Sequence, residues 1–94
     1  MSYGPRWKAK TMRACQLRGA KRAVMGALLI LCDWRGRVSK PYHEIAEIAG
    51  ISARHCFAHL HDLIDAHYVL LLHRGQGRRP SMFQVVPADQ ISGA

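Results

Sequence analysis

The sequence feature that most constrains this fold is a helix end followed almost at once by a helix start. Apolar side chains recur at helical spacing through residues 42–49, and Pro41 suits the start of that helix because its missing N–H would be unpaired there. Gly50 can adopt the positive φ that ends a helix, and Ser52 can cap the first turn of the next one. Two helices joined by a tight turn are therefore expected.

The helix that begins after Ser52 has two different sides. Its packed side carries Cys56, Leu60, Leu63, Ile64 and His67. Its presented side carries Arg54, His55, Ala58, His61 and Asp62. Because residues three and four apart share a helix face, the first side is expected to fill the core and the second to be presented at the surface.

Regular elements are also expected on both sides of this helix pair. Before it, apolar residues recur at steps of three and four over residues 17–31, which predicts an earlier helix. Gly36 then breaks the period and leaves room for a turn and a very short strand at residues 37–38. After the pair, the short apolar runs 68–72 and 82–86 predict two paired strands, joined by a hairpin loop that contains two glycines and a proline.

The chain length of 94 residues leaves room for one domain with one modest core. Hydrophobic residues make up 49% and charged residues 21% of the chain, which is typical of a folded globular protein. The pattern predicts a basic, flexible or partly helical arm over residues 1–16, outside the core. A folded domain over residues 17–87 and a short tail over 88–94 are expected to follow.

Charge is distributed unevenly along the chain. Lysine and arginine total 14 against 6 acidic residues, which gives a formal net charge of +8. Such an excess on a small surface implies an anionic partner, with nucleic acid ahead of an anionic membrane. Asp33 is the first acidic residue, and seven cations precede it: Arg6, Lys8, Lys10, Arg13, Arg18, Lys21 and Arg22. A one-sided run of this kind exceeds what solubility alone requires.

Cysteine usage and the apolar run over residues 23–32 bear on the compartment. Cys15, Cys32 and Cys56 are odd in number and follow no paired spacing, so a disulfide framework is not expected. The apolar run imitates a signal peptide, but residues 33–35 are Asp-Trp-Arg instead of a small-residue cleavage site. The run is also shorter than the roughly 20 residues that span a bilayer. A cytoplasmic location without export is the prediction.

The segment Ile45–Ser52 resembles the helix-turn-helix signature of the winged helix-turn-helix superfamily. In it an alanine permits close helix crossing, Gly50 makes the turn, and Ile51 fills the core between the helices. The similarity extends from about Lys21 to Val86 and is strongest to small bacterial, plasmid and phage regulators and to the DNA-binding modules of replication initiators. It implies an α+β, mainly helical fold with three helices and a C-terminal two-stranded β-hairpin wing.

Two histidines depart from the pattern of this superfamily. His59 stands where relatives usually carry an apolar or small residue, which affects the packing of the third helix. His67 stands where relatives often have glycine, so the turn into the first wing strand is expected to be less tight.

The resemblance makes the helix after Ser52 the recognition helix, which enters the major groove of DNA. Arg54 is the best candidate for a base contact, since its guanidinium can donate two hydrogen bonds to guanine O6 and N7. Phe57 lies at the border of the packed side, so burial and contact with a thymine methyl group are equally open for it. The candidate residues of this helix are Ser52, Ala53, Arg54, His55, Phe57, Ala58 and His61.

Two further groups are candidates for contact with phosphate. The hairpin loop carries three cations and no acid, and its candidate residues are Arg74, Gln76, Arg78 and Arg79. In the resemblance this loop is the wing, which contacts phosphates or the minor groove. The N-terminal arm offers Arg6, Lys8, Lys10 and Arg13, which can strengthen binding along the DNA backbone without reading sequence.

Three rival functions are weaker. A metal sensor would use His55, Cys56 and His59, but no second ligand pair stands at zinc-finger spacing, so neither a metal nor another cofactor is expected. A protein-interaction adaptor with this fold would not need the loop arginines. An enzyme is least favoured, because the sequence has no nucleophile, base and orienting residue in a catalytic pattern.

The predicted function is therefore sequence-specific binding of double-stranded DNA, as a repressor-like transcription regulator. A homodimer on a pseudo-palindromic site is expected because a lone domain buries a limited DNA surface. Trp7, Met12 and Leu17 are the candidate dimer residues, since no core position is assigned to them. The alternative is a replication or maintenance factor of a plasmid or phage.

Overall fold

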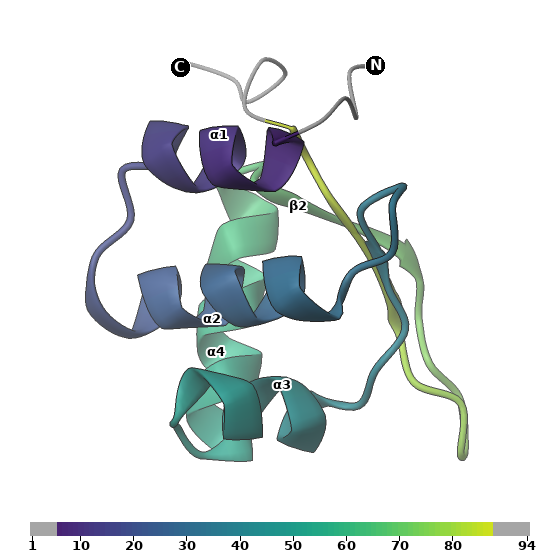
Figure 1. The fold of residues 1–94 in the computed structure, drawn as a ribbon. Helices are drawn as coiled ribbons and strands as arrows, with labels where there is room; N and C mark the ends of the chain where they lie inside the picture. Colours follow the sequence, from purple (N-terminus) through teal and green to yellow (C-terminus); the bar gives the residue numbers. More distant parts are fainter. Residues whose placement is uncertain (1–5, 88–94) are drawn as a thin grey trace.

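The computed structural model describes residues 6–87, which form a small α+β domain with four helices and a three-stranded antiparallel sheet (Figure 1). The elements follow one another as α1 (Trp7–Ala14), α2 (Gly19–Leu31), β1 (Arg37–Val38), α3 (Tyr42–Ala49), α4 (Ala53–Asp65), β2 (Val69–His73) and β3 (Met82–Val85). The predicted α+β, mainly helical class is confirmed. The predicted count of three helices is wrong for this part of the chain, because α1 is a further helix. The tail over residues 88–94 lies outside the described residues.

The tight turn between α3 and α4 is formed by the residues that predicted it. Gly50 has a φ of 76°, in the left-handed region, and ends α3. The N–H of Ile51 then donates to the carbonyl oxygen of Ala46 over 3.1 Å, which closes the helix end. Ser52 caps α4, since its Oγ accepts a hydrogen bond from the N–H of His55 over 3.2 Å. The two helices therefore follow each other with two residues of turn and a cap between them.

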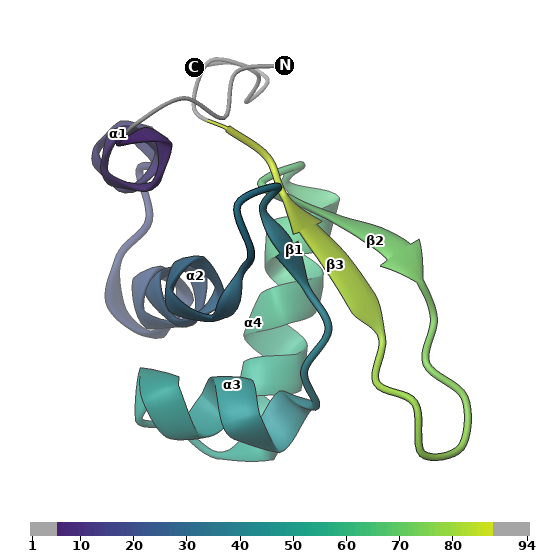
Figure 2. The same cartoon turned by 45° about the vertical axis from the view of Figure 1, so that its right-hand side comes forward.

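The sheet has the strand order β1-β3-β2, so the last strand lies in the middle. Both neighbours pair antiparallel with β3, and Phe83 is opposite Val38 on one side and Leu71 on the other. An irregularity between Leu71 and His73 interrupts the β2–β3 ladder near the loop. The very short strand predicted at residues 37–38 is confirmed, and it fastens the helical part of the chain to the β2–β3 pair (Figure 2).

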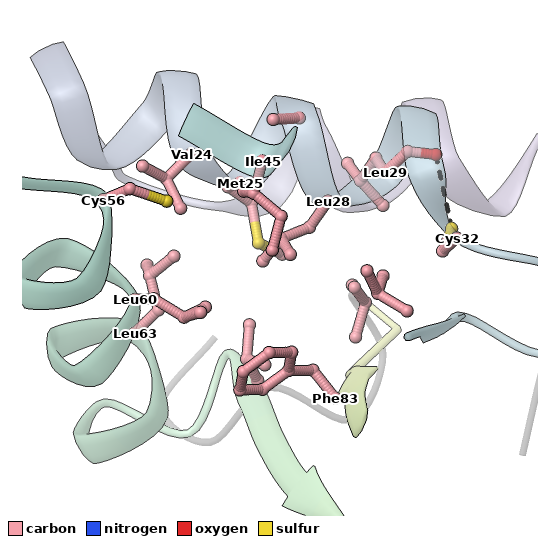
Figure 3. Close-up of a cluster of buried hydrophobic side chains, with 14 of the residues drawn as sticks. Val24, Met25, Leu28, Leu29, Cys32, Ile45, Cys56, Leu60, Leu63 and Phe83 are labelled. Atoms are coloured by element: carbon pink, nitrogen blue, oxygen red, sulfur yellow. Dashed lines mark hydrogen bonds between the residues drawn. The ribbon is translucent and has the colours of Figure 1, made fainter. Parts of the chain in front are cut away.

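The core lies where α2, α3 and α4 meet the inner face of the sheet (Figure 3). The side chains of Leu28, Ile45, Leu60 and Phe83 are each 0–1% exposed, and they come from four different elements. Burying an aliphatic or aromatic side chain of this size contributes about 1.5–3 kcal/mol relative to leaving it exposed. The core therefore fixes the position of α4 and of β3 together.

The turn from α2 to β1 is organised by one carboxylate. Oδ1 of Asp33 accepts hydrogen bonds from the N–H groups of Arg35 (2.8 Å) and Arg37 (3.0 Å). These bonds, with the nearby arginine charges, hold the pKa of Asp33 below its ordinary value. The turn brings Gly36 to the central strand, where its carbonyl oxygen accepts from the N–H of Val85 over 2.8 Å.

The N-terminal segment differs most from its prediction. Trp7 and Thr11, four residues apart on α1, are 8% and 0% exposed, and Trp7 belongs to the hydrophobic core. Met12 and Leu17 pack against the same core. The prediction that residues 1–16 lie outside the core is therefore wrong for α1. Trp7, Met12 and Leu17, the candidate dimer residues, therefore pack against the core of their own domain.

Replacing Trp7 by alanine is expected to lower the free energy of unfolding by about 3 kcal/mol, because it leaves a large cavity between α1 and the core. Lys10→Ala, on the exposed side of the same helix, should change it by less than about 0.5 kcal/mol. Urea denaturation followed by circular dichroism measures both. Equal stability of Trp7→Ala and the parent protein would show that α1 does not contribute to the core.

The end of α4 places a histidine in a conformation that favours glycine. His67 has a φ of 65° and is exposed beyond the last residue of α4, so its predicted place on the packed side of the helix is wrong. Its N–H donates to the carbonyl oxygen of Ile64, and the N–H of Tyr68 donates to that of Leu63, each over 3.0 Å. This pair of bonds is the helix ending that normally has glycine at the left-handed position. Both hydrogen bonds form, so the prediction of a less tight turn is wrong, and the strain lies in the left-handed backbone of His67.

His67→Gly is expected to raise the free energy of unfolding by about 0.5–1 kcal/mol. It removes the left-handed strain, and the greater entropy of glycine in the unfolded chain offsets part of the gain. His67→Ala keeps a Cβ in the same conformation and should give no such gain. Thermal unfolding of the three proteins tests the prediction, and a lower melting temperature for His67→Gly would contradict it.

Candidate nucleic-acid interface

The first turns of α4 present an exposed surface without acidic residues. The chain has no acidic residue from Ile48 to His61. Arg54 and Ala58 are exposed, as are Ser52, Ala53 and His55. On the opposite side of the helix, Cys56 and Leu60 are fully buried. The predicted division of α4 into a packed and a presented side is therefore confirmed for its first two turns.

Ser52 and His55 are engaged with each other. Besides accepting from the N–H of His55, Oγ of Ser52 lies 3.1 Å from Nδ1 of the His55 ring. A hydroxyl can accept one hydrogen bond and donate another, so one Ser52 side chain serves both contacts. This pair holds the start of α4, and Arg54 between them is exposed with its guanidinium available to a partner.

Phe57 is not buried, so the first of the two alternatives for it is wrong, and its contact with a thymine methyl group stays a prediction. It is 48% exposed, and its ring also contacts two neighbours. The ring centroid lies 5.1 Å from that of Tyr42 in an edge-to-face arrangement and 4.3 Å from that of His61. Tyr42 in turn lies 6.1 Å from Phe83. These aromatic rings connect the exposed side of α4 to the start of α3 and to β3.

The loop between β2 and β3 holds its arginines in a defined conformation. Its candidate residues Arg74, Gln76, Arg78 and Arg79 are all exposed. The N–H of Gly75 donates to Oγ of Ser81 over 2.9 Å, and the N–H of Arg79 donates to the carbonyl oxygen of Gln76 over 3.0 Å. From Ala66 to Pro87 the sequence contains no acidic residue, so the loop has no carboxylate of its own beside these cations.

A shallow pocket of about 210 Å³ lies between this loop and the start of α3. Lys40 and Arg79 contribute cations to its lining, and Tyr42 and Phe83 contribute aromatic rings. Lys40 was missed as a site residue, although its position directly before Pro41 at a helix start was visible in the sequence. Its closeness to Arg79, which is distant from it along the chain, depends on the tertiary fold.

The structure separates the candidate residues into two groups. In Figure 1 and Figure 2, α4 begins at the lower end of the molecule, and the β2–β3 loop reaches down toward that end. In both views α1 lies at the upper end, with α2 between it and α3. Arg6, Lys8, Lys10 and Arg13 belong to α1 and its N-cap, so they do not lie with the other candidates.

The residues considered for a metal site point in different directions. His55 is exposed and Cys56 is fully buried, and burial raises the pKa of the Cys56 thiol, which disfavours the thiolate that binds metals. Nδ1 of His59 is buried, and no hydrogen-bond partner is found for it within the described region. Residues 6–87 contain no group of three or more histidine, cysteine or acidic side chains arranged to hold a metal ion.

Comparisons with known proteins returned no matching family model, no matching curated protein and no matching solved structure. Over residues 6–87, none of the helices has the length and apolar character needed to cross a membrane.

Gly75→Ala is expected to change the loop conformation, because a Cβ there would collide with the backbone of Arg79, Pro80 and Ser81. Amide chemical shifts should change throughout residues 74–81, while those of core residues such as Leu60 stay in place. Gln76→Ala is the matched control, since its side chain is exposed and the loop uses its backbone carbonyl. Unchanged amide shifts at residues 78–81 in Gly75→Ala would contradict the close approach of Gly75 to the backbone of residues 79–81.

Proposed function

We propose that this protein binds double-stranded DNA as a winged helix-turn-helix domain. In this proposal α4 is the recognition helix, the β2–β3 hairpin is the wing, and the Gly50–Ser52 turn joins the two helices of the motif. The protein acts as a sequence-specific regulator of transcription. It uses no metal or cofactor, and it performs no catalysis.

The observation that carries the proposal is the collection of exposed cations at one end of the domain. Arg54 at the start of α4, Lys40 before α3 and Arg78 and Arg79 in the loop are all exposed. The segments that carry Arg54 and the loop arginines contain no acidic residue. Exposed cations in segments without carboxylates attract phosphate oxygens, and their binding releases the counterions held by DNA.

In this proposal the side chains of α4 contact bases, and those of the loop and Lys40 contact phosphates. Arg54 reads a guanine in the major groove through two hydrogen bonds, and the neighbouring Ala58 and Phe57 offer apolar atoms to a thymine methyl group. Arg78 and Arg79 contact phosphates beside the adjacent groove. Lys40 and Arg79 both line the shallow pocket, so the two cations can contact one phosphate bound there.

A homodimer remains the proposed binding form, with two recognition helices one turn of DNA apart. Its interface cannot use Trp7, which is buried in the domain. Large apolar side chains are exposed elsewhere, with Ile30 and Trp34 exposed by 69% and 71% at the end of α2 and in the turn that follows. Selection of bound fragments from random DNA tests both parts of the proposal, since an enriched inverted repeat is expected.

Arg54→Ala is expected to weaken binding to the selected site by about 1–3 kcal/mol and to relax the choice of base at one position in each half-site. Arg78→Ala with Arg79→Ala should weaken binding to selected and unrelated DNA alike. The slope of log affinity against log salt should then fall by about 0.9 for each phosphate that the protein no longer neutralises. Fluorescence anisotropy over a salt series measures both effects.

Arg37→Ala is the control variant, because Arg37 is exposed and lies in β1. This control should leave the base preference unchanged, and its affinity for DNA should stay close to that of the parent protein. A flat salt response of the parent protein would refute the nucleic-acid function. If Arg54→Ala kept its base preference while the loop pair lost it, the hairpin would be the reading element.

A further inference from the structure

The exposed side of α1 carries a basic stripe that the proposed DNA interface does not use. Lys10 and Arg13 are three residues apart, so they share one face of the helix. Arg6 is the N-cap residue with a φ of 66°, and all three cations are exposed. The N–H of Lys10 donates to the carbonyl oxygen of Arg6 over 3.0 Å, which places Arg6 on the first turn of the helix. The first acidic residue of the chain is Asp33, well beyond α1.

The stripe faces away from the core. Trp7 and Thr11, on the other side of α1, are buried. In both views of the fold α2 lies between α1 and α3 (Figure 1, Figure 2). The stripe and the start of α4 are therefore at opposite ends of the domain. One straight duplex bound along α4 and the loop would leave the stripe exposed.

We propose that the stripe of Arg6, Lys10 and Arg13 is a second binding surface for double-stranded DNA, so that one domain bridges two duplexes. The proposal rests on the proposed function for its first duplex. The seven residue steps from Arg6 to Arg13 extend about 10 Å along the helix axis, so the three long side chains can reach several phosphates of one duplex. The contact is made with the backbone and reads no sequence.

The structure favours a duplex over an anionic membrane as the partner of this stripe. A helix that binds a membrane surface inserts its apolar face between the lipids. The apolar face of α1 is occupied, because Trp7 is part of the hydrophobic core. The exposed side of α1 carries Arg6, Lys10 and Arg13 and no large apolar side chain among the residues described there, and a regular array of phosphates complements these cations.

A two-duplex capture assay with the full chain tests the proposal. One duplex with the selected site is fixed to beads, and retention of a second, fluorescent duplex is measured. We expect Lys10→Gln with Arg13→Gln to reduce retention about tenfold and to lower the salt slope of retention by about 1.8, for two phosphate contacts. Its affinity for a single duplex in solution should stay within about twofold of the parent protein, because the stripe is remote from α4.

Two control variants complete the assay. Lys10→Arg with Arg13→Lys keeps both charges and should bridge like the parent protein. Arg35→Gln with Arg37→Gln removes two exposed cations elsewhere and should also bridge. Circular dichroism checks that each variant is folded, and the charge-retaining variant separates loss of charge from loss of structure.

The outcomes separate this inference from the function on which it rests. If the parent protein binds one duplex but never retains a second, the bridging inference is wrong and DNA binding stands. If it binds no duplex, both are wrong. If the glutamine pair still bridges, a dimer with two α4 surfaces is responsible and the stripe is not. If the pair loses single-duplex affinity as strongly as retention, the stripe contacts the first duplex, and the inference is overturned.

Discussion

The rest of the structure depends on the helix end at Gly50 and the helix start at Ser52. The positive φ of Gly50 lets the chain reverse, and the hydroxyl of Ser52 satisfies an N–H that α4 would otherwise leave unpaired. This turn sets the direction of α4 relative to α3 and so decides which of its side chains reach the core. Cys56 and Leu60 are buried for this reason, and Arg54 is exposed by the same geometry.

The loop arginines depend on the core through the central strand. Phe83 is buried between the helices and the two outer strands, and its backbone is paired on both sides. The chain leaves β2 and enters β3 at fixed positions, so the loop extends from a rigid base. Within it, Ser81 and Gly75 are tied by a hydrogen bond. This bond holds the backbone of the loop, from which the exposed arginine side chains extend.

Local signals in the sequence predicted most of the fold because the relevant physics is local. Gly50, Ser52 and the apolar period of α4 act within a few residues, and the strands were visible as short apolar runs. The role of Trp7 was not predictable, because a single aromatic residue among cations gives no period and its burial depends on α2. That Lys40 and Arg79 line one pocket was missed for the same reason. Arg54 was predicted through the resemblance and the loop arginines from their loop, and the structure shows that these side chains are exposed.

The arrangement of the basic stripe on α1 depends on the core contacts that keep α1 helical. An isolated helix of eight residues is marginal in water, and α1 has no acidic residue in its first turn to favour its N-terminal dipole. Its exposed cations also repel one another, most directly Lys10 and Arg13, which are three residues apart on the helix. Burial of Trp7 supplies the missing stabilisation, and a bound phosphate array would remove the repulsion. Helix formation in α1 and anion binding by its exposed side are therefore coupled, with each favouring the other.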